Sequence, residues 1–268
     1  MNFLSAHNIK RLILFHILAL ALFFSWWIDG DLTRGLWQQL DEAVFFTLNG
    51  LLADSPSAQR FWAVANHRAF DLVAMTLFAL IYLHFIFSDR QRYINERIGL
   101  FFFLAFFVVI VVQLSHILFS SLGQQGYDGY NGQANELRLS PSRVLTPVHL
   151  LSQLVPDIKA KDSTGGSFPG DHAIVLFMFS GFFLIFIGIK RGLLALVIAI
   201  LLSTPRLVAG AHWFTDNYVG GVSVVLVGIA WLYCTPLKSK ALVWFTPVGK
   251  VLSPLLLKPL KRLRVIKS

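Results

Sequence analysis

Six apolar stretches divide the sequence, and each is long enough to cross a membrane as a helix. About 17–25 apolar residues span the roughly 30 Å hydrocarbon core. Backbone groups cannot stay unpaired in lipid, so we expect an all-α fold, a six-transmembrane-helix bundle that forms a single domain over residues 1–268. The stretches lie approximately at 12–28, 70–87, 98–120, 173–189, 192–209 and 217–234.

Two of the polar connections are long. Residues 29–69 contain a helical repeat of apolar positions, which predicts a helix that either lies in the membrane interface or packs as a collar around the bundle, the collar being favoured. The repeat is made by Leu36, Leu40, Val44, Leu48 and Leu51. The longest polar segment runs from about 121 to 171 and opens with LGQQGYDGYNGQANE, whose Gly and Asn content is typical of a loop. A loop of this length is uncommon unless it is functional or disordered.

Composition and charge support a membrane protein and give its orientation. Hydrophobic residues make up 56% of the chain and charged residues 14%, against about 25% charged residues in soluble domains. One set of connections, which includes both termini, carries 15 of the 23 basic residues and only two acidic residues. By the positive-inside rule this set faces the cytoplasm and the two long connections face outward. The net charge of +9 is therefore a topology signal, and we expect no nucleic-acid partner.

A first polar cluster, GGSFPGDH at 165–172, precedes the fourth stretch on the outer side. Glycines such as Gly170 permit close backbone approach, and Ser167 or Asp171 can cap the helix. The start of that helix presents free N–H groups and a partial positive charge, which suits an anion such as phosphate. His172 would lie about one residue inside this entrance.

A second polar cluster, PRLVAGAHWFTD at 205–216, joins the last two stretches on the same outer surface. The planar guanidinium of Arg206 can pair with phosphate oxygens. His212 and Asp216 are four residues apart, so in a helix the carboxylate can hold the imidazole in one tautomer. Taken singly, each side chain also fits a structural role, as a packed histidine, a headgroup anchor or a helix cap. Together they predict a phosphate site where two distant segments meet.

The two clusters resemble the second and third signatures of the type-2 phosphatidic acid phosphatase superfamily. The resemblance implies that His212 attacks phosphorus, that Asp216 orients it and that His172 protonates the leaving group. It also implies that Arg206, Ser167 and the Gly170 backbone hold the phosphoryl oxygens, with no metal and no cofactor.

The first signature of that superfamily, a lysine followed after six residues by arginine and proline, is altered in this chain. LRLSPS at 137–142 supplies Arg138, but Pro141 is displaced by two positions and no lysine lies seven residues upstream. His116 and Lys161 are both candidates for the missing lysine. Asp171 stands in the second signature where most members have a small residue. Arg138, Lys161 and Asp171 are further candidates for phosphate-binding residues.

Additional stretches resemble bacterial inner-membrane lipid A phosphotransferases. They are ALFFSWWI at 21–28, NHRAFD at 66–71 and TPL at 235–237, beside the two signatures. The likeness covers most of residues 10–240 and is weakest across 120–160. It implies a multi-pass protein of the bacterial inner membrane whose site faces the periplasm. The partners implied are two lipids, undecaprenyl diphosphate as phosphate donor and the 1-phosphate of lipid A as acceptor, with a phosphohistidine between the two steps.

The sequence leaves two alternative functions open. If water replaces lipid A as acceptor, the protein is a lipid phosphatase that hydrolyses undecaprenyl diphosphate or phosphatidate-type substrates. Residue spacing does not decide between these acceptors. An inactive lipid-binding membrane protein is the other alternative, and its only support is the altered first signature.

Overall fold

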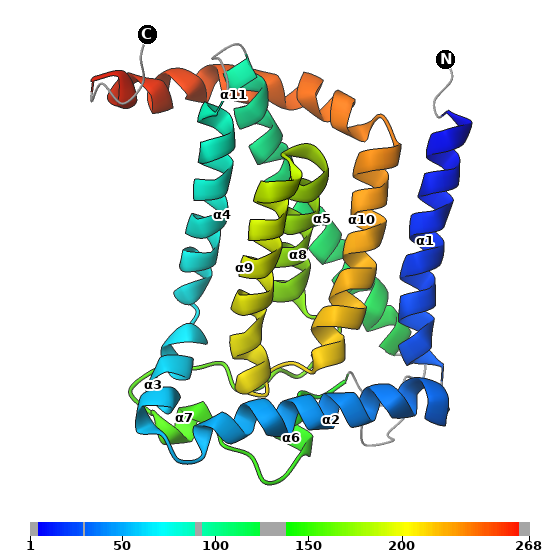
Figure 1. The fold of residues 1–268 in the computed structure, drawn as a ribbon, viewed down its shortest axis with the longest axis vertical. Coiled ribbons are helices and arrows are strands. Elements are labelled where there is room, and N and C mark those ends of the chain that lie inside the picture. The colour runs from blue at the N-terminus through cyan, green and yellow to red at the C-terminus, as the bar shows by residue number, and fades with distance from the viewer. Residues whose placement is uncertain (1–4, 29, 89–92, 124–137, 263–268) are drawn as a thin grey trace.

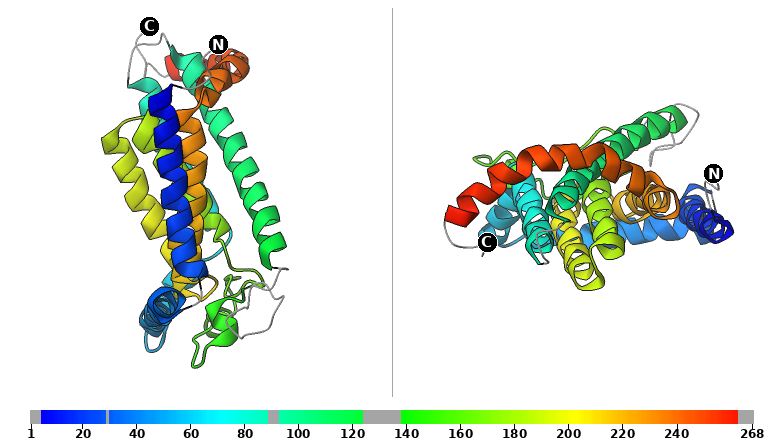
Figure 2. Two further views of the ribbon diagram at one scale, coloured as in Figure 1. Left: turned by 90° about the vertical axis from the view of Figure 1, so that its right-hand side faces the viewer. Right: turned by 90° about the horizontal axis from the view of Figure 1, so that it is seen from above.

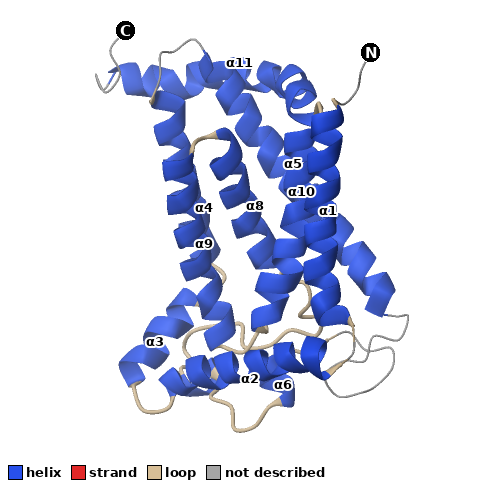
Figure 3. Cartoon of the chain, turned by 45° about the vertical axis from the view of Figure 1, so that its right-hand side comes forward, coloured by secondary structure: helices blue, strands red, loops and turns tan. Residues whose placement is uncertain are grey.

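The computed structural model describes residues 5–28, 30–88, 93–123 and 138–262. Within these ranges the chain consists of helices joined by loops, and no strand is present (Figure 3). The predicted all-α class is confirmed.

Apolar helices run side by side along the long axis of the molecule (Figure 1). They are α1 (Ala6–Trp27), α4 (Phe70–Phe87), α5 (Ile94–Gly123), α8 (Asp171–Phe186), α9 (Ile189–Val208) and α10 (Val222–Cys234), the last preceded by the π-helical η4 (Asp216–Gly221). Five predicted stretches form helices long and apolar enough to cross a membrane, so the protein is a multi-pass membrane protein. The stretch at 173–189 forms a shorter apolar helix of 16 residues, and a total of six spans stays a prediction.

The short helix α8 lies at the centre of the bundle. Half of its 16 residues are buried, and they pack against α9 and α10. A helix that is apolar on every side has no polar face for solvent, which explains its enclosed position. Gly188 ends it with a φ of 120°, a value that residues with a side chain rarely adopt, and the chain turns back into α9.

Short and amphipathic helices cover the two ends of the bundle. α11 (Leu237–Arg262) crosses the end where α1 begins (Figure 1). Four others gather at the opposite end, and residues 124–137 of the predicted loop lie outside the described residues. These four are α2 (Leu36–Asn49), α3 (Pro56–Ala65), α6 (Pro141–Val144) and α7 (Leu151–Leu154).

The helix predicted from the repeat in residues 29–69 is present as α2, which lies across the end of the bundle (Figure 1), and its location in a membrane interface stays a prediction. Its apolar positions Leu36 and Leu40 are exposed, whereas Asp41, Phe45 and Asn49 are buried against the bundle. The helix therefore exposes the first part of its apolar repeat, packs Leu48 of that repeat against a buried apolar cluster, and turns a partly polar face inward. Burying a carboxylate costs free energy unless it is paired, so Asp41 requires hydrogen-bond or ion-pair partners inside the protein.

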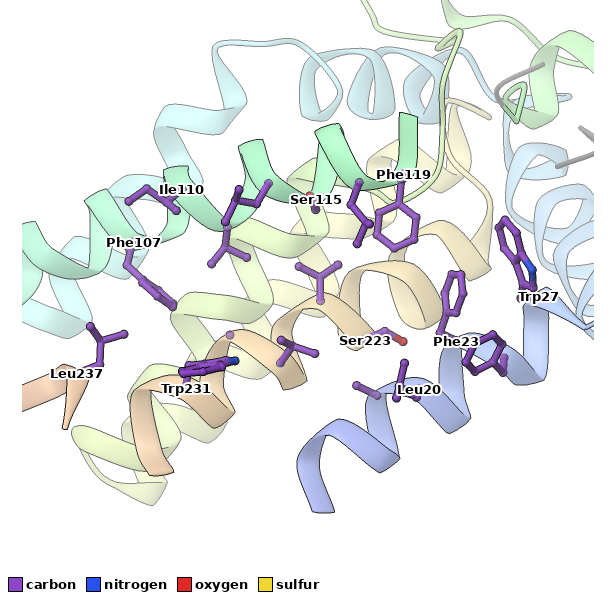
Figure 4. Close-up of a pocket in the computed structure, with 18 residues that line it drawn as sticks. Leu20, Phe23, Trp27, Phe107, Ile110, Ser115, Phe119, Ser223, Trp231 and Leu237 are labelled. Atoms are coloured by element: carbon purple, nitrogen blue, oxygen red, sulfur yellow. The ribbon is translucent and has the colours of Figure 1, made fainter. Parts of the chain in front are cut away.

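An apolar groove of about 670 Å³ lies between α1, α5 and α10 (Figure 4). Figure 2 shows the C-terminal half of α5 diverging from the bundle, and residues of this half line the groove. At one end of the groove, the rings of Phe23 and Phe119 contact Phe168, with centroid distances of 6.3 and 5.3 Å. Phe168 belongs to the polar segment that precedes α8. The groove thus leads from the membrane-spanning helices to that segment.

Candidate active site

The two polar segments meet at the end of the bundle that carries α2 and α3. The Gly170 N–H at the start of α8 donates to the Asp216 carbonyl oxygen over 2.9 Å. A side chain at Gly170 would overlap the Asn217 amide, so only glycine allows this approach. The contact between distant segments that the sequence predicts is therefore present.

The His212 imidazole is buried, and its orientation is fixed by one nitrogen. Its Nδ1 lies 2.9 Å from the Ser167 carbonyl oxygen. A carbonyl only accepts, so Nδ1 carries the proton and the neutral ring leaves a lone pair on Nε2. Among the described residues that Nε2 is buried without a hydrogen-bond partner, and Asp171 Oδ1 lies 3.9 Å from it. An unpaired buried nitrogen is costly and therefore marks a position reserved for a ligand.

The Asp216 carboxylate also faces Nδ1 of His212, but it lies farther from this nitrogen than the Ser167 carbonyl does. Its Oδ2 lies 3.6 Å from Nδ1 of His212 and accepts the Trp213 N–H over 2.7 Å. α9 ends at Val208, and residues 209–213 form a turn. His212 and Asp216 therefore do not lie on one face of a helix, which is the arrangement that their spacing in the sequence suggests. Ser167 is thus the closer partner of Nδ1, and Asp216 holds the turn that carries His212.

The Arg138 guanidinium pairs with two buried carboxylates. One terminal nitrogen lies 2.8 Å from Asp216 Oδ1, and the other lies 2.6 Å from Asp41 Oδ2. The rings of Trp26 and Trp213 lie 5.0 and 4.9 Å from its central carbon. Burial raises the pKa of the Asp41 carboxyl, and the Arg138 charge opposes that shift. Through these contacts Arg138 fixes the positions of Asp41 and Asp216. Its contact with phosphate stays a prediction.

Asp41 joins α2 to the turn that carries His212. Both of its oxygens bind Thr215, one accepting the backbone N–H over 2.8 Å and the other the hydroxyl over 2.6 Å. The inward-facing carboxylate of α2 is therefore fully paired.

A second group of contacts holds His172 and Arg206. The Asp71 Oδ1 lies 3.6 Å from His172 Nδ1 and 3.7 Å from an Arg206 terminal nitrogen. The other terminal nitrogen of Arg206 donates to the Asn66 side-chain and backbone oxygens over 2.6 and 3.0 Å. The NHRAFD stretch therefore orients both the imidazole and the guanidinium.

Asp71, His172 and Arg206 line a pocket of about 340 Å³, named here the His172 pocket. Lys161 lines it, whereas His116 lies exposed on α5 and does not, so position favours Lys161 as the replacement for the missing lysine. The polar lining is formed by Arg68, Asp71, Lys161, Asp171, His172 and Arg206.

Asp171 stands between the His172 pocket and His212. Its carboxylate lines the pocket, lies near Nε2 of His212 and accepts the His172 N–H over 2.7 Å at the start of α8. It thus occupies the helix N-terminus that a phosphate would use.

Ser167 and Gly170, predicted to hold phosphoryl oxygens, are bonded within the protein. The Ser167 hydroxyl donates to the Arg138 carbonyl oxygen over 3.1 Å, and the Gly170 N–H is engaged by Asp216. Their contacts with phosphate stay predictions. In the described part of the chain, no group of three or more His, Cys, Asp or Glu side chains is arranged to hold a metal ion.

Comparisons with known proteins agree with this geometry. The family model of the PAP2 superfamily matches residues 139–240, which include both signatures. Lipid A 1-diphosphate synthase from Escherichia coli (strain K12) is 32% identical over 238 residues, covering 89% of this chain and 93% of that protein. The chain belongs to the same family, within the PAP2 superfamily. It is an enzyme of the phosphotransferase and phosphatase class with lipid substrates. No solved structure matches the chain.

Replacing Asp71 with asparagine in this PAP2 enzyme tests the contacts around His172 and Arg206. We expect kcat/KM to fall about 10²-fold, the lower range for loss of acid–base function, because both side chains lose their shared carboxylate. Asp71 is half exposed, so the fold should persist. Asp157→Asn, which removes an exposed ion pair with Arg60, is the control and should change activity less than twofold. Equal activities of the two variants would contradict the assignment.

Proposed function

We propose that the protein transfers the distal phosphate of undecaprenyl diphosphate to the 1-phosphate of lipid A, with its site facing the periplasm of a bacterial inner membrane. The observation that supports this most is the buried Nε2 of His212, which has no hydrogen-bond partner in the described part of the chain and lies 3.9 Å from Asp171, a lining residue of the His172 pocket. The name of the Escherichia coli relative supplies the identity of the acceptor.

In the first step, His212 Nε2 attacks the distal phosphorus and forms a phosphohistidine. The bond from that phosphorus to the bridging oxygen breaks, and His172 gives a proton to the departing undecaprenyl phosphate. Arg206 and Lys161 neutralise the charge on the phosphoryl oxygens, which is how most phosphoryl-transfer acceleration arises. Asp71 keeps His172 and Arg206 facing the same pocket.

In the second step, an oxygen of the lipid A 1-phosphate attacks the phosphohistidine. The bond from phosphorus to Nε2 breaks, which gives lipid A 1-diphosphate and restores His212. A phosphate monoester is already an anionic nucleophile, so this step needs no base to remove a proton, and His172 regains from the solvent the proton that it gave up in the first step. The apolar groove along α1, α5 and α10 suits the aliphatic chain of a lipid substrate (Figure 4).

The purified protein, incubated with donor labelled in the distal phosphate, tests this function. With lipid A present, we expect the label in lipid A 1-diphosphate and undecaprenyl phosphate released in equal amount. Without lipid A, release of labelled inorganic phosphate should be at least tenfold slower. Equal formation of inorganic phosphate in both incubations would reject transfer and favour the lipid phosphatase.

A further inference from the structure

A second polar pocket of about 740 Å³ adjoins the His172 pocket and is named here the Lys159 pocket. One wall is the loop between α3 and α4, and the other is the segment 156–163. The walls are joined by the Asn66 side chain, which donates to the Lys161 carbonyl oxygen over 2.8 Å, and by a backbone bridge from His67 to Ala160. The structure thus builds a defined cavity at this position.

The Lys159 and His172 pockets share Arg68 and Lys161 as lining residues. A molecule in the Lys159 pocket can therefore extend a phosphate past these two cations toward His172. The larger pocket lies within the range of about 300–1,000 Å³ that is usual for small-molecule sites.

The lining of the Lys159 pocket suits an anionic, hydroxyl-rich ligand. In the described part of the chain, Arg68, Lys159 and Lys161 form no ion pair within 4.0 Å, so none of these three cations is held in contact with a carboxylate. Asp162 also lines the pocket, and its buried Oδ1 has no hydrogen-bond partner among the described residues. A carboxylate oxygen of this kind accepts from a ligand hydroxyl. Two serine hydroxyls complete the polar wall, Ser152 and Ser163.

We infer that the Lys159 pocket binds the phosphorylated sugar headgroup of the acceptor lipid. The inference rests on the proposed function, because it names the place of the acceptor in that reaction. The donor headgroup is a diphosphate without sugar, and the His172 pocket provides for it. A phosphorylated sugar requires both cations and hydroxyl partners, and the Lys159 pocket offers both. Holding the acceptor beside the phosphohistidine favours transfer over attack by water, since proximity acts as a high effective concentration.

Lys159→Glu tests this inference, because Lys159 is exposed and lines only the Lys159 pocket. With saturating donor, we expect the KM for lipid A to rise about tenfold, as an attractive charge becomes a repulsive one. Arg60→Glu is the matched control. Arg60 is an exposed cation of α3 that lines neither pocket and pairs with Asp157, so its variant should change this KM less than twofold.

The rate of undecaprenyl phosphate release without lipid A separates acceptor binding from chemistry. For Lys159→Glu we expect a change of less than twofold in this rate. An unchanged KM for lipid A, an equal loss of the donor-only rate, or an equal effect of Arg60→Glu would each overturn the inference. If the wild-type protein itself forms no lipid A 1-diphosphate, the proposed function fails first, and that outcome is visible before any variant is compared.

Discussion

Replacing His212 with glutamine is expected to abolish turnover, with a loss of at least about 10⁴-fold in kcat. Removing the nucleophile of a covalent mechanism typically costs this much or more. Glutamine keeps a polar group of similar size against the Ser167 carbonyl, so the fold should persist. Release of undecaprenyl phosphate from labelled donor measures the effect with and without lipid A.

The matched control for this experiment is His116→Gln. His116 is exposed on α5 and lines neither polar pocket, so its replacement should leave kcat within twofold of the wild-type value. If His212→Gln keeps more than about 1% of the wild-type rate, His212 is not the nucleophile, and the site has been misassigned or the protein acts without it.

Replacing Arg138 with methionine is expected to lower the free energy of unfolding by about 3–5 kcal/mol. Removing one partner of a buried ion pair leaves an uncompensated charge, and here two buried carboxylates, Asp41 and Asp216, lose their cation together. Because Asp41 belongs to α2 and Asp216 to the turn that carries His212, activity should be lost with stability. Thermal unfolding in detergent, followed by size-exclusion chromatography, measures the change.

Arg60→Met serves as the control for Arg138→Met. Its ion pair with Asp157 is exposed, and exposed pairs contribute at most about 1 kcal/mol. If both variants unfold at the same temperature as the wild-type protein, the Arg138 network does not hold the site together. If Arg138→Met remains stable but binds donor poorly, the phosphate-contact role predicted for Arg138 becomes the better account.

The fold was largely predictable from the sequence because lipid allows few solutions for the backbone. Uninterrupted apolar stretches marked the long helices, and the repeat in residues 29–69 marked α2. α8 is shorter than its stretch because Gly188 breaks the helix. The orientation of α2 was harder to predict, because an apolar repeat does not show whether lipid or protein covers the apolar face of the helix. Only the structure shows that Asp41 faces inward.

The site was predictable in part. His172, Arg206, His212 and Asp216 stood out because ionisable residues at the ends of apolar helices are costly. Asp41 and Thr215 carried no such signal, because one lies within an amphipathic helix and the other resembles a helix cap.

Asn66 and Asp71 were visible only as part of the NHRAFD stretch, to which the sequence assigned no chemical role. Their contacts with Arg206 join segments 140 and 135 residues apart, and spacing along the chain does not reveal such pairs. A carboxylate in the first turn of an apolar helix was the one available signal, and Asp71 in α4 fits it.

The most direct test of the central claim is to trap the phosphorylated enzyme. The protein is mixed with donor labelled in the distal phosphate, quenched in alkali within milliseconds and digested for mass spectrometry. The account predicts phosphate on His212, lost when lipid A is added and recovered in lipid A 1-diphosphate. Phosphate on another residue, or turnover with no label on the protein at any time, would contradict it.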